Sequence, residues 1–255
     1  MKQSLTIAKR ELGSFFSSPV FYVVCAVFLI IYGFIFFNIL NYFSLQSLQA
    51  SQFQGMDAGF NLNEMVIEPS LQNMAVILLL IIPIITMRSF SEEKKTKTIN
   101  LLLSSPIHLK EIVAGKFLAC MAVVTVMLLL SSYSVLFLLA IGKPEIGPVA
   151  SGYLGLWLMA GCYISAGVFA SSLTDNQIIA AVVGFGFTLF MWIIGWGAQA
   201  AGPGFGELLK FLSLVDHLER FLKGIVDSSD AIYYLTFIVF GLFLTHRVLD
   251  SKRWR

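Results

Sequence analysis

Long apolar stretches alternate with short polar segments along the whole chain. The apolar stretches cover approximately residues 20–40, 71–87, 113–141, 149–172, 178–198 and 231–245. A helix needs about 20 apolar residues to cross the hydrocarbon core of a bilayer, so we predict six transmembrane helices. Pro83 lies inside the second stretch, where we expect a kink, because proline removes one helical hydrogen bond.

Polar residues fill the segment between the first two apolar stretches. Residues 41–70 are rich in Gln, Ser and Asn, contain three acids and hold no Lys or Arg, so we predict a loop there. The other predicted connections are a charged loop over 88–112, a tight turn over 142–148 and a short link over 174–177.

The overall composition separates this chain from ordinary soluble proteins. Hydrophobic residues make up 57% of the sequence and charged residues 13%, whereas soluble domains are about half apolar and about a quarter charged. The sequence therefore predicts an all-α membrane protein with a single transmembrane domain over residues 1–255.

Two further segments have the pattern of amphipathic helices. Residues 1–18 predict an N-terminal interfacial helix lying along the membrane, with charges on the opposite face. Its predicted apolar face comprises Leu5, Ala8, Leu12, Phe15 and Phe16. Residues 199–230 predict an amphipathic extracytoplasmic helical segment between spans five and six. Its apolar positions are Leu208, Leu212, Val215, Leu218, Phe221, Leu222 and Ile225.

The distribution of basic residues predicts the orientation of the chain. No Lys or Arg occurs between Arg10 and Arg88. With the N-terminus inside, 13 of the 17 Lys and Arg residues lie on the cytoplasmic side, as the positive-inside rule requires. The four left outside are Lys143, Lys210, Arg220 and Lys223. We therefore predict that both termini and the 88–112 loop are cytoplasmic.

The sequence holds few of the patterns that carry chemistry. No Asp, Glu, Lys or Arg lies in the middle of a predicted span, which argues against a secondary transporter that couples ions to transport. The chain also lacks the Gly-x-x-x-x-Gly-Lys-Ser/Thr phosphate loop, so an ATP site would have to lie on another chain. The spacing of Cys25, Cys120 and Cys162 fits no metal site, and we predict neither a metal nor an enzymatic activity.

The largest charge cluster is the stretch from Met87 to Ile107, between the second and third apolar stretches. We predict a short helix there, with Ser91 as its N-cap and Glu92 and Glu93 in the first turn. Three apolar residues share one face of this predicted helix, namely Ile99, Leu102 and Leu103. Pro106 is expected to end it.

This stretch resembles the first cytoplasmic loop of type-2 ABC transporter permeases, in particular the gliding-motility-associated subgroup. The matching positions are Arg88, Phe90, Glu92, Glu93, Thr98, Leu101 to Leu103, Pro106, Gly115 and Lys116. In that family the loop is the coupling helix that docks on an ATPase. The resemblance therefore implies coupling roles for Arg88, Phe90, Glu92, Glu93, Lys94, Thr98, Leu101, Leu102 and Pro106. Two positions depart from the pattern: a usual Gly is Lys97, and a usual acid is Asn100.

A second resemblance to the same subgroup covers Leu212 to Asp227. The residues that carry it in the extracytoplasmic helix are His217, Glu219, Phe221 and Gly224. From the amphipathic pattern we expect His217 to be a surface side chain. Glycines crowd spans four and five, which favours close packing between helices, although a moving helix that lines a path stays open. These glycines are Gly152, Gly155, Gly161, Gly167, Gly184, Gly186, Gly195 and Gly197.

The resemblance implies a permease subunit in the bacterial cytoplasmic (inner) membrane. It would pair with a second permease protomer and two ABC ATPase subunits, which bind ATP and Mg, and contact membrane lipid but no nucleic acid. It would export a substrate or act mechanically on a periplasmic or membrane accessory protein. The alternatives are a secondary carrier or channel without an ATPase, and a non-transporting membrane anchor.

Overall fold

The computed structural model describes residues 2–52, 61–99, 107–142, 144–198, 202 and 204–253, and the described residues contain no β-strand. The α-helices are α1 (Lys2–Ser17), α2 (Pro19–Gln52), α3 (Glu68–Thr86), α4 (Arg88–Lys95), α6 (Leu109–Ser131), α7 (Tyr133–Ile141), α8 (Ile146–Leu173), α9 (Gln177–Ala198), α10 (Phe205–Leu212), α11 (Leu214–Leu222) and α12 (Ser228–Arg253). A short π-helix, η1 (Asn63–Ile67), precedes α3.

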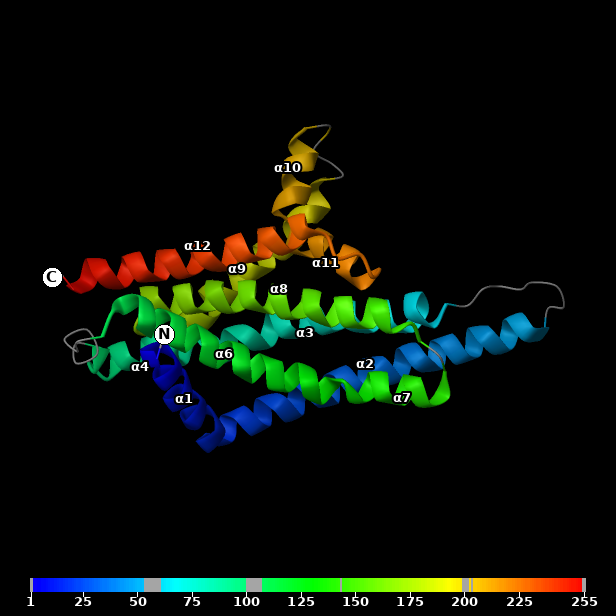
Figure 1. Cartoon of the computed structure of the whole chain (residues 1–255), viewed down its shortest axis with the longest axis horizontal. Coiled ribbons are helices and arrows are strands. Elements are labelled where there is room, and N and C mark those ends of the chain that lie inside the picture. The colour runs from blue at the N-terminus through cyan, green and yellow to red at the C-terminus, as the bar shows by residue number, and fades with distance from the viewer. Residues whose placement is uncertain are drawn as a thin grey trace.

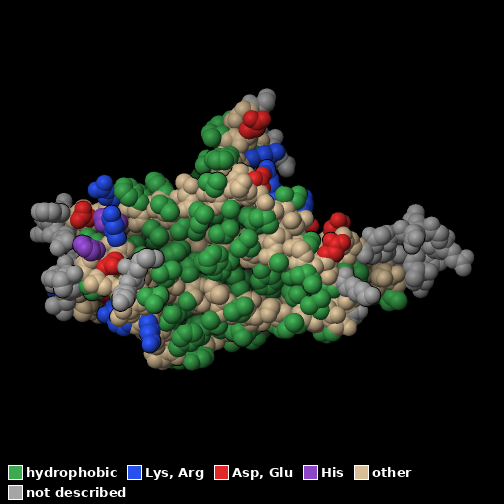
Figure 2. All heavy atoms as spheres, viewed as in Figure 1, with side chains coloured by type: hydrophobic (Ala, Val, Ile, Leu, Met, Phe, Trp, Pro, Cys, Tyr) green, Lys and Arg blue, Asp and Glu red, His purple; other side chains and the backbone are tan. Residues whose placement is uncertain are grey.

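Six helical segments are long and apolar enough to cross a membrane, which confirms the predicted number of spans. They are Pro19–Gln49, Asn63–Lys95, Leu109–Ala140, Ile146–Leu173, Gln177–Ala198 and Ser228–Ser251. The long helices α2, α3, α6, α8 and α12 run along the length of the molecule (Figure 1). Hydrophobic side chains cover the middle of the visible face, and charged side chains gather toward its two ends (Figure 2). The chain is a multi-pass membrane protein.

Both chain termini and α4 lie toward one end of this bundle, which we call the terminal end (Figure 1). The start of α8 and the helix α11 lie toward the other end, which we call the distal end. This placement is the one expected when an even number of helices crosses between the two termini.

The predicted loop over 41–70 is wrong for most of the residues that the structure describes there. Helix α2 continues to Gln52, and η1 and α3 begin at Asn63 and Glu68. Residues 41–52 contain no Gly or Pro, and their Leu, Gln and Ala residues favour helix even though the segment is polar. Gln46 also donates through Nε2 to the Tyr42 hydroxyl one turn earlier, at 2.7 Å. The prediction from polarity alone therefore ended the first helix too early. Residues 53–60 lie outside the described part.

Two spans are interrupted at points that the sequence did not indicate. The second continues as helix through Pro83, where a kink stays a prediction, and α3 ends at Thr86, just before the break at Met87. The third divides at Ser132 into α6 and α7. Near this joint the Tyr32 hydroxyl hydrogen-bonds that of Ser134 at 2.7 Å, which attaches α7 to α2.

Helix α8 forms the centre of the bundle and packs against α3, α6, α9, α11 and α12. Its glycines allow close approach: a Cβ on Gly155 would lie 2.6 Å from Phe221 Cβ, and one on Gly161 would lie 2.7 Å from Ile238 Cδ1. The packing interpretation is thus confirmed at these positions. It is wrong for Gly186 in α9, where a Cβ would meet nothing within 4 Å.

The predicted N-terminal helix is α1, which packs against α6. Ile7 and Ala8 are buried, and a Cβ on Gly115 would lie 2.8 Å from the Ile7 side chain. Leu5, from the predicted apolar face, is 69% exposed. The face that α1 buries in the bundle is therefore centred on Ile7 and Ala8, and an interfacial position for Leu5 stays a prediction.

The predicted amphipathic segment contains two short helices, α10 and α11. Helix α10 contacts α9 and projects away from the long helices, whereas α11 lies against α8 near the start of α12 (Figure 1). Ser151 of α8 donates to the Phe221 carbonyl at 2.7 Å and so fastens α11 to the distal end of α8. Together with the Gly155–Phe221 contact, this hydrogen bond fixes where α11 sits.

Candidate functional site

Helix α4 contains most of the described residues that the sequence assigned to coupling. It continues from α3 after one turn residue, Met87, whose backbone is still helical (φ −55, ψ −30). The predicted N-cap role of Ser91 is wrong, because Ser91 lies inside α4 and its hydroxyl donates to the Met87 carbonyl. Glu92 and Glu93 consequently lie in the second turn of the helix rather than the first. The helix needs no local cap residue because it directly follows another helix.

Ser171, near the end of α8, takes over the capping of α4. Its hydroxyl oxygen accepts from the amides of Phe90 and Ser91 at 3.0 and 3.1 Å, and it donates to the Met87 carbonyl at 2.9 Å. The amides of Phe90 and Ser91 are of the kind that a helix start leaves without partners. The break between α3 and α4 is therefore closed by a side chain that comes from a third helix.

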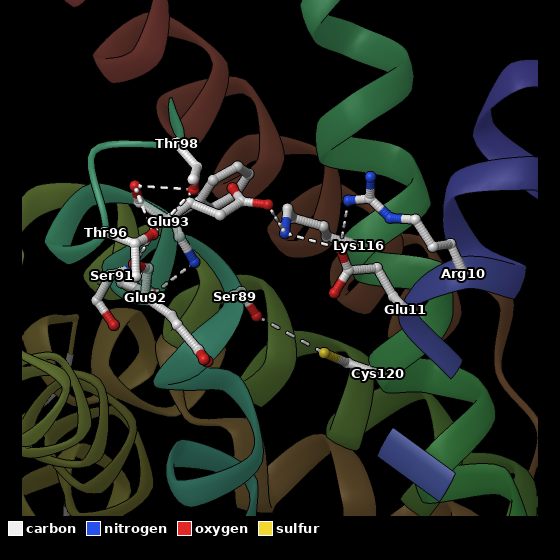
Figure 3. A network of polar contacts seen from close by, with 12 residues as sticks. Arg10, Glu11, Ser89, Ser91, Glu92, Glu93, Thr96, Thr98, Lys116 and Cys120 are labelled. Carbon is white, nitrogen blue, oxygen red and sulfur yellow. Dashed lines mark hydrogen bonds and ion pairs between the residues drawn. The ribbon is translucent and has the colours of Figure 1, made fainter. Parts of the chain in front are cut away.

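A buried lysine of α6 joins two other helices at this end. Lys116 Nζ lies 3.0 Å from Glu11 Oε1 of α1 and 2.8 Å from Glu93 Oε1 of α4, and its side chain is 4% exposed (Figure 3). The same nitrogen lies 5.2 Å from the centre of the Phe90 ring. We call Lys116, Glu11, Glu93 and Phe90 the Lys116 cluster. Burying an unpaired ammonium would cost free energy, and pairing with the two carboxylates offsets this cost.

Lys94 makes a second link from α4 to α8. Its side chain is buried, and Nζ donates to the carbonyl of Ser172 in the last turn of α8. A cation is favourable at this position because the last carbonyls of a helix carry a partial negative charge. Helix α4 is thus attached to α8 through both Ser171 and Lys94.

The end of α4 explains one of the departures from the family pattern. Lys97 has φ 60, and no other non-glycine residue in the described ranges has a positive φ. Glycine adopts this conformation without the roughly 1–2 kcal/mol that a side chain adds, which accounts for the usual Gly at this position. Thr96 and Thr98 support the turn: their hydroxyls lie 2.9 Å apart, and each donates to a carbonyl of α4.

The predicted coupling residues divide into an inward and an outward set. Phe90, Glu93 and Lys94 point into the protein, and Arg88 borders a cavity of about 30 Å³ beside the α1–α2 junction. Glu92 and Thr98 are exposed, as are Lys95 and Lys97 beside them. Leu101, Leu102 and Pro106 lie outside the described residues. Among the coupling residues that the structure describes, the outward set is the one exposed to a partner.

Sequence reasoning assigned Glu93 and Lys94 of α4 but not the residues of other helices that hold α4 in place. Glu11 and Ser171 were not singled out, and Lys116 was noticed only for its place in the family pattern. A lone lysine within the apolar run of α6 was an available signal, since such a charge requires a partner. The partners themselves come from segments about 23 to 105 positions away and carry no local pattern.

The residues singled out in the distal segment lie on or just after α11. Phe221 is buried against α8, Glu219 is partly exposed, and Gly224 has φ +84 in the turn that follows α11. The prediction that His217 is a surface side chain is wrong, because only 9% of the residue is exposed. Its ring faces α12 rather than solvent. Within the described residues, no group of three His, Cys, Asp or Glu side chains could hold a metal ion.

The fold and this arrangement define a helical membrane protein with a charged segment anchored to its core. A model of the ABC-2 family transporter proteins matches residues 5–246, nearly the whole length. The chain belongs to this family and is thereby a membrane component of an ABC transporter. A comparison with curated proteins gave no match.

Proposed function

We propose that this chain is the permease subunit of an ATP-driven ABC-2 exporter and that α4 is its coupling helix. The outward face of α4, with Glu92, Lys95 and Lys97, would contact the ATPase. The family membership supports a partner ATPase, and the exposure of these charged side chains supports this face as the contact. A working unit would contain two permease chains and two ATPases, which bind ATP and Mg.

The single observation that carries the coupling proposal is the attachment of α4 to three other helices. Glu93 reaches Lys116 of α6, Lys116 reaches Glu11 of α1, and Ser171 of α8 holds the start of α4. A push on α4 would therefore be passed to α1, α6 and α8 together. In this proposal Glu93 transmits movement, whereas Glu92 recognises the ATPase.

The terminal end would face the cytoplasm of a bacterial inner membrane, as the distribution of basic residues predicts. The transported substrate is an unassigned exported molecule, or the movement acts on a periplasmic accessory protein. A gliding-motility-type role rests on the sequence resemblance. A carrier or channel that works without an ATPase has less support, because the chain belongs to an ABC transporter family.

The test compares one variant of each face of α4. The tagged chain is purified from its host membrane, and co-purifying proteins with a phosphate loop are identified. Glu92→Lys with Lys95→Glu should lose the ATPase, because both substitutions reverse exposed charges. Glu93→Gln should retain the ATPase but lower its turnover in the assembled complex, because the link to Lys116 is broken.

Exchange of the exposed Asp175, in the turn after α8, for Asn serves as the control and should change neither property. Failure of any ATPase to co-purify with the unmodified chain would contradict the proposed function. Loss of ATPase binding in Glu93→Gln but not in the outward variant would reverse the two assigned roles.

A further inference from the structure

A second buried polar cluster lies at the distal end, far along α8 from the Lys116 cluster. The His217 ring of α11 stacks on Tyr233 of α12, with ring centres 4.1 Å apart and an angle of 23° between the planes. Phe211 of α10 meets the same ring edge-on at 5.8 Å. Asp230, in the first turn of α12, is 0% exposed and faces the histidine.

Both nitrogens of the His217 ring have hydrogen-bond partners, and these partners determine how many protons are present. Nε2 lies 2.9 Å from the Phe211 carbonyl oxygen, and Nδ1 lies 2.6 Å from Asp230 Oδ1. A carbonyl oxygen can only accept, so Nε2 must carry a hydrogen. The short contact at Nδ1 also needs a hydrogen, which belongs either to the imidazolium or to the carboxylic acid. In both cases the pair holds one proton more than a neutral imidazole and a carboxylate.

The charges around the pair balance only when this proton is counted. Arg220 Nη1 lies 3.5 Å from Asp227 Oδ2 and 3.6 Å from Asp230 Oδ1. Hydrogen bonds from Ser229, with a smaller contribution from Arg220, lower the pKa of Asp227 below its ordinary value, so this carboxylate stays charged. Two carboxylates therefore face one guanidinium and one added proton.

The remaining charged groups near the pair line one open cavity. His217 and Arg220 border an open cavity of about 400 Å³ whose other charged lining residues are Glu207, Lys210, Asp216, Glu219 and Lys223. Three of these five residues are acids and two are bases. The rings of Tyr233 and Tyr234 pack against His217, and the Cys162 thiol lies against the Tyr234 carbonyl; phenols and thiols are ordinarily neutral at physiological pH. The cavity also gives the proton a route to solvent.

We propose that His217 and Asp230 form a proton-binding site that fastens α11 to both α12 and α10, and that one of these two contacts is lost when the proton leaves. After deprotonation, one ring nitrogen presents a lone pair to an oxygen that can only accept. If Nε2 keeps its hydrogen, Nδ1 and the Asp230 carboxylate repel each other at 2.6 Å; if Nδ1 takes it, Nε2 and the Phe211 carbonyl repel. Either way one contact becomes repulsive, and α10 or α11 must move. This proposal is independent of ATPase docking at α4.

The first test detects the proton directly. The chain is labelled with ¹⁵N-histidine, reconstituted in lipid nanodiscs and examined by ¹⁵N NMR, with His217→Asn used to assign the signals. At neutral pH the unmodified protein should show both His217 nitrogens bonded to hydrogen or a shared hydrogen at Nδ1. A bare Nε2, or a bare Nδ1 that shares no hydrogen with Asp230, would overturn the proposal, and this test needs no folded variant at Asp230.

The second test follows the release of α11 by hydrogen exchange in residues 205–222, corrected for the intrinsic effect of pH. Opening linked to the loss of one proton should increase about tenfold per pH unit while the closed state holds the proton and the open state does not, and should level off once the closed state has lost it. Asp230→Asn should abolish this slope, because its neutral amide can donate to Nδ1 while Nε2 still donates to Phe211. Asp227→Asn, the matched control at the partly exposed carboxylate, should retain the slope. A slope of zero in the unmodified chain, or an unchanged slope in Asp230→Asn, would overturn the proposal.

Discussion

The two buried charge clusters at opposite ends of α8 both fasten helices to one another, but they use different chemical groups. At the terminal end, Lys116 lies between Glu11 and Glu93 and joins three helices with a group that is a cation at neutral pH in ordinary proteins. At the distal end, His217 and Asp230 join two helices through a single proton. Histidine is the side chain whose charge ordinarily changes near neutral pH. In our proposal the proton is part of the distal attachment, whereas the attachment at Lys116 is an ion pair between a lysine and two carboxylates.

The largest expected effect comes from removing the buried ammonium group of Lys116. Lys116→Met should destabilise the purified chain by about 3 kcal/mol, the lower end of the range for breaking a buried pair, because both carboxylates keep some exposure. Denaturant unfolding in detergent micelles measures the change. Lys95→Met, at an exposed position of the same region, should stay within about 0.5 kcal/mol of the unmodified protein. Equal losses in both variants would show that the cluster is no stronger than a surface charge.

A smaller effect should come from substituting Gly155, the glycine of α8 against which α11 packs. An added methyl in Gly155→Ala would meet Phe221 at 2.6–2.8 Å, and Phe221 is fully buried, so we expect a loss of about 1–3 kcal/mol. Gly186→Ala meets nothing within 4 Å and should instead stabilise by up to about 1 kcal/mol through helix propensity. The same unfolding measurement compares the two. A gain in both variants would mean that α11 is not held by this packing.

The smallest expected effect comes from Tyr233→Phe, which tests whether the pH dependence comes from His217 and Asp230 or from the neighbouring phenol. Tyr233→Phe keeps the ring stacked on His217 but removes the hydroxyl, which donates to the Leu212 carbonyl at 2.7 Å. The loss of this hydrogen bond should cost about 1 kcal/mol. Hydrogen exchange in α11 should rise at every pH by the same factor and keep its pH slope. If the pH dependence of exchange disappeared, the proton-dependent contact would lie at the Tyr233 phenol rather than at His217 and Asp230. The proposed difference between the two clusters would then be wrong.

The sequence was sufficient to predict the spans because their signal is local. Six apolar stretches correspond to six membrane-crossing helices, and the charge cluster after Met87 correctly indicated a short helix. The predicted bounds of that helix, from Ser91 to Pro106, are wrong, because α4 spans Arg88–Lys95 and ends in a turn before Ile99. The direction of Glu93 was not predictable, because spacing defines which face of α4 a residue occupies but not which helix lies opposite. Ser171 was missed for the same reason, since its cap bridges residues about 80 positions apart.

The burial of His217 was predictable in part. Leu214, His217, Leu218 and Phe221 follow the i, i+3, i+4, i+7 spacing of one helix face, and all four are buried. The three apolar members should have placed the histidine on the packed side of α11. Its partner Asp230 could not have been inferred, because it lies in another helix and looks like the polar end of a loop.

Helix α8 makes the two ends mechanically dependent on each other. Ser151, which holds α11, and Ser171, which holds α4, are 20 positions apart in one continuous helix, or about 30 Å. Treated as a rigid rod pivoting at its centre, α8 would shift each end by about 0.5 Å, in opposite directions, for a tilt of only about 2°. That displacement equals the whole range of normal N–H···O distances, about 2.7–3.2 Å. A lever of this length therefore allows a sub-ångström movement at one end to make or break a hydrogen bond at the other.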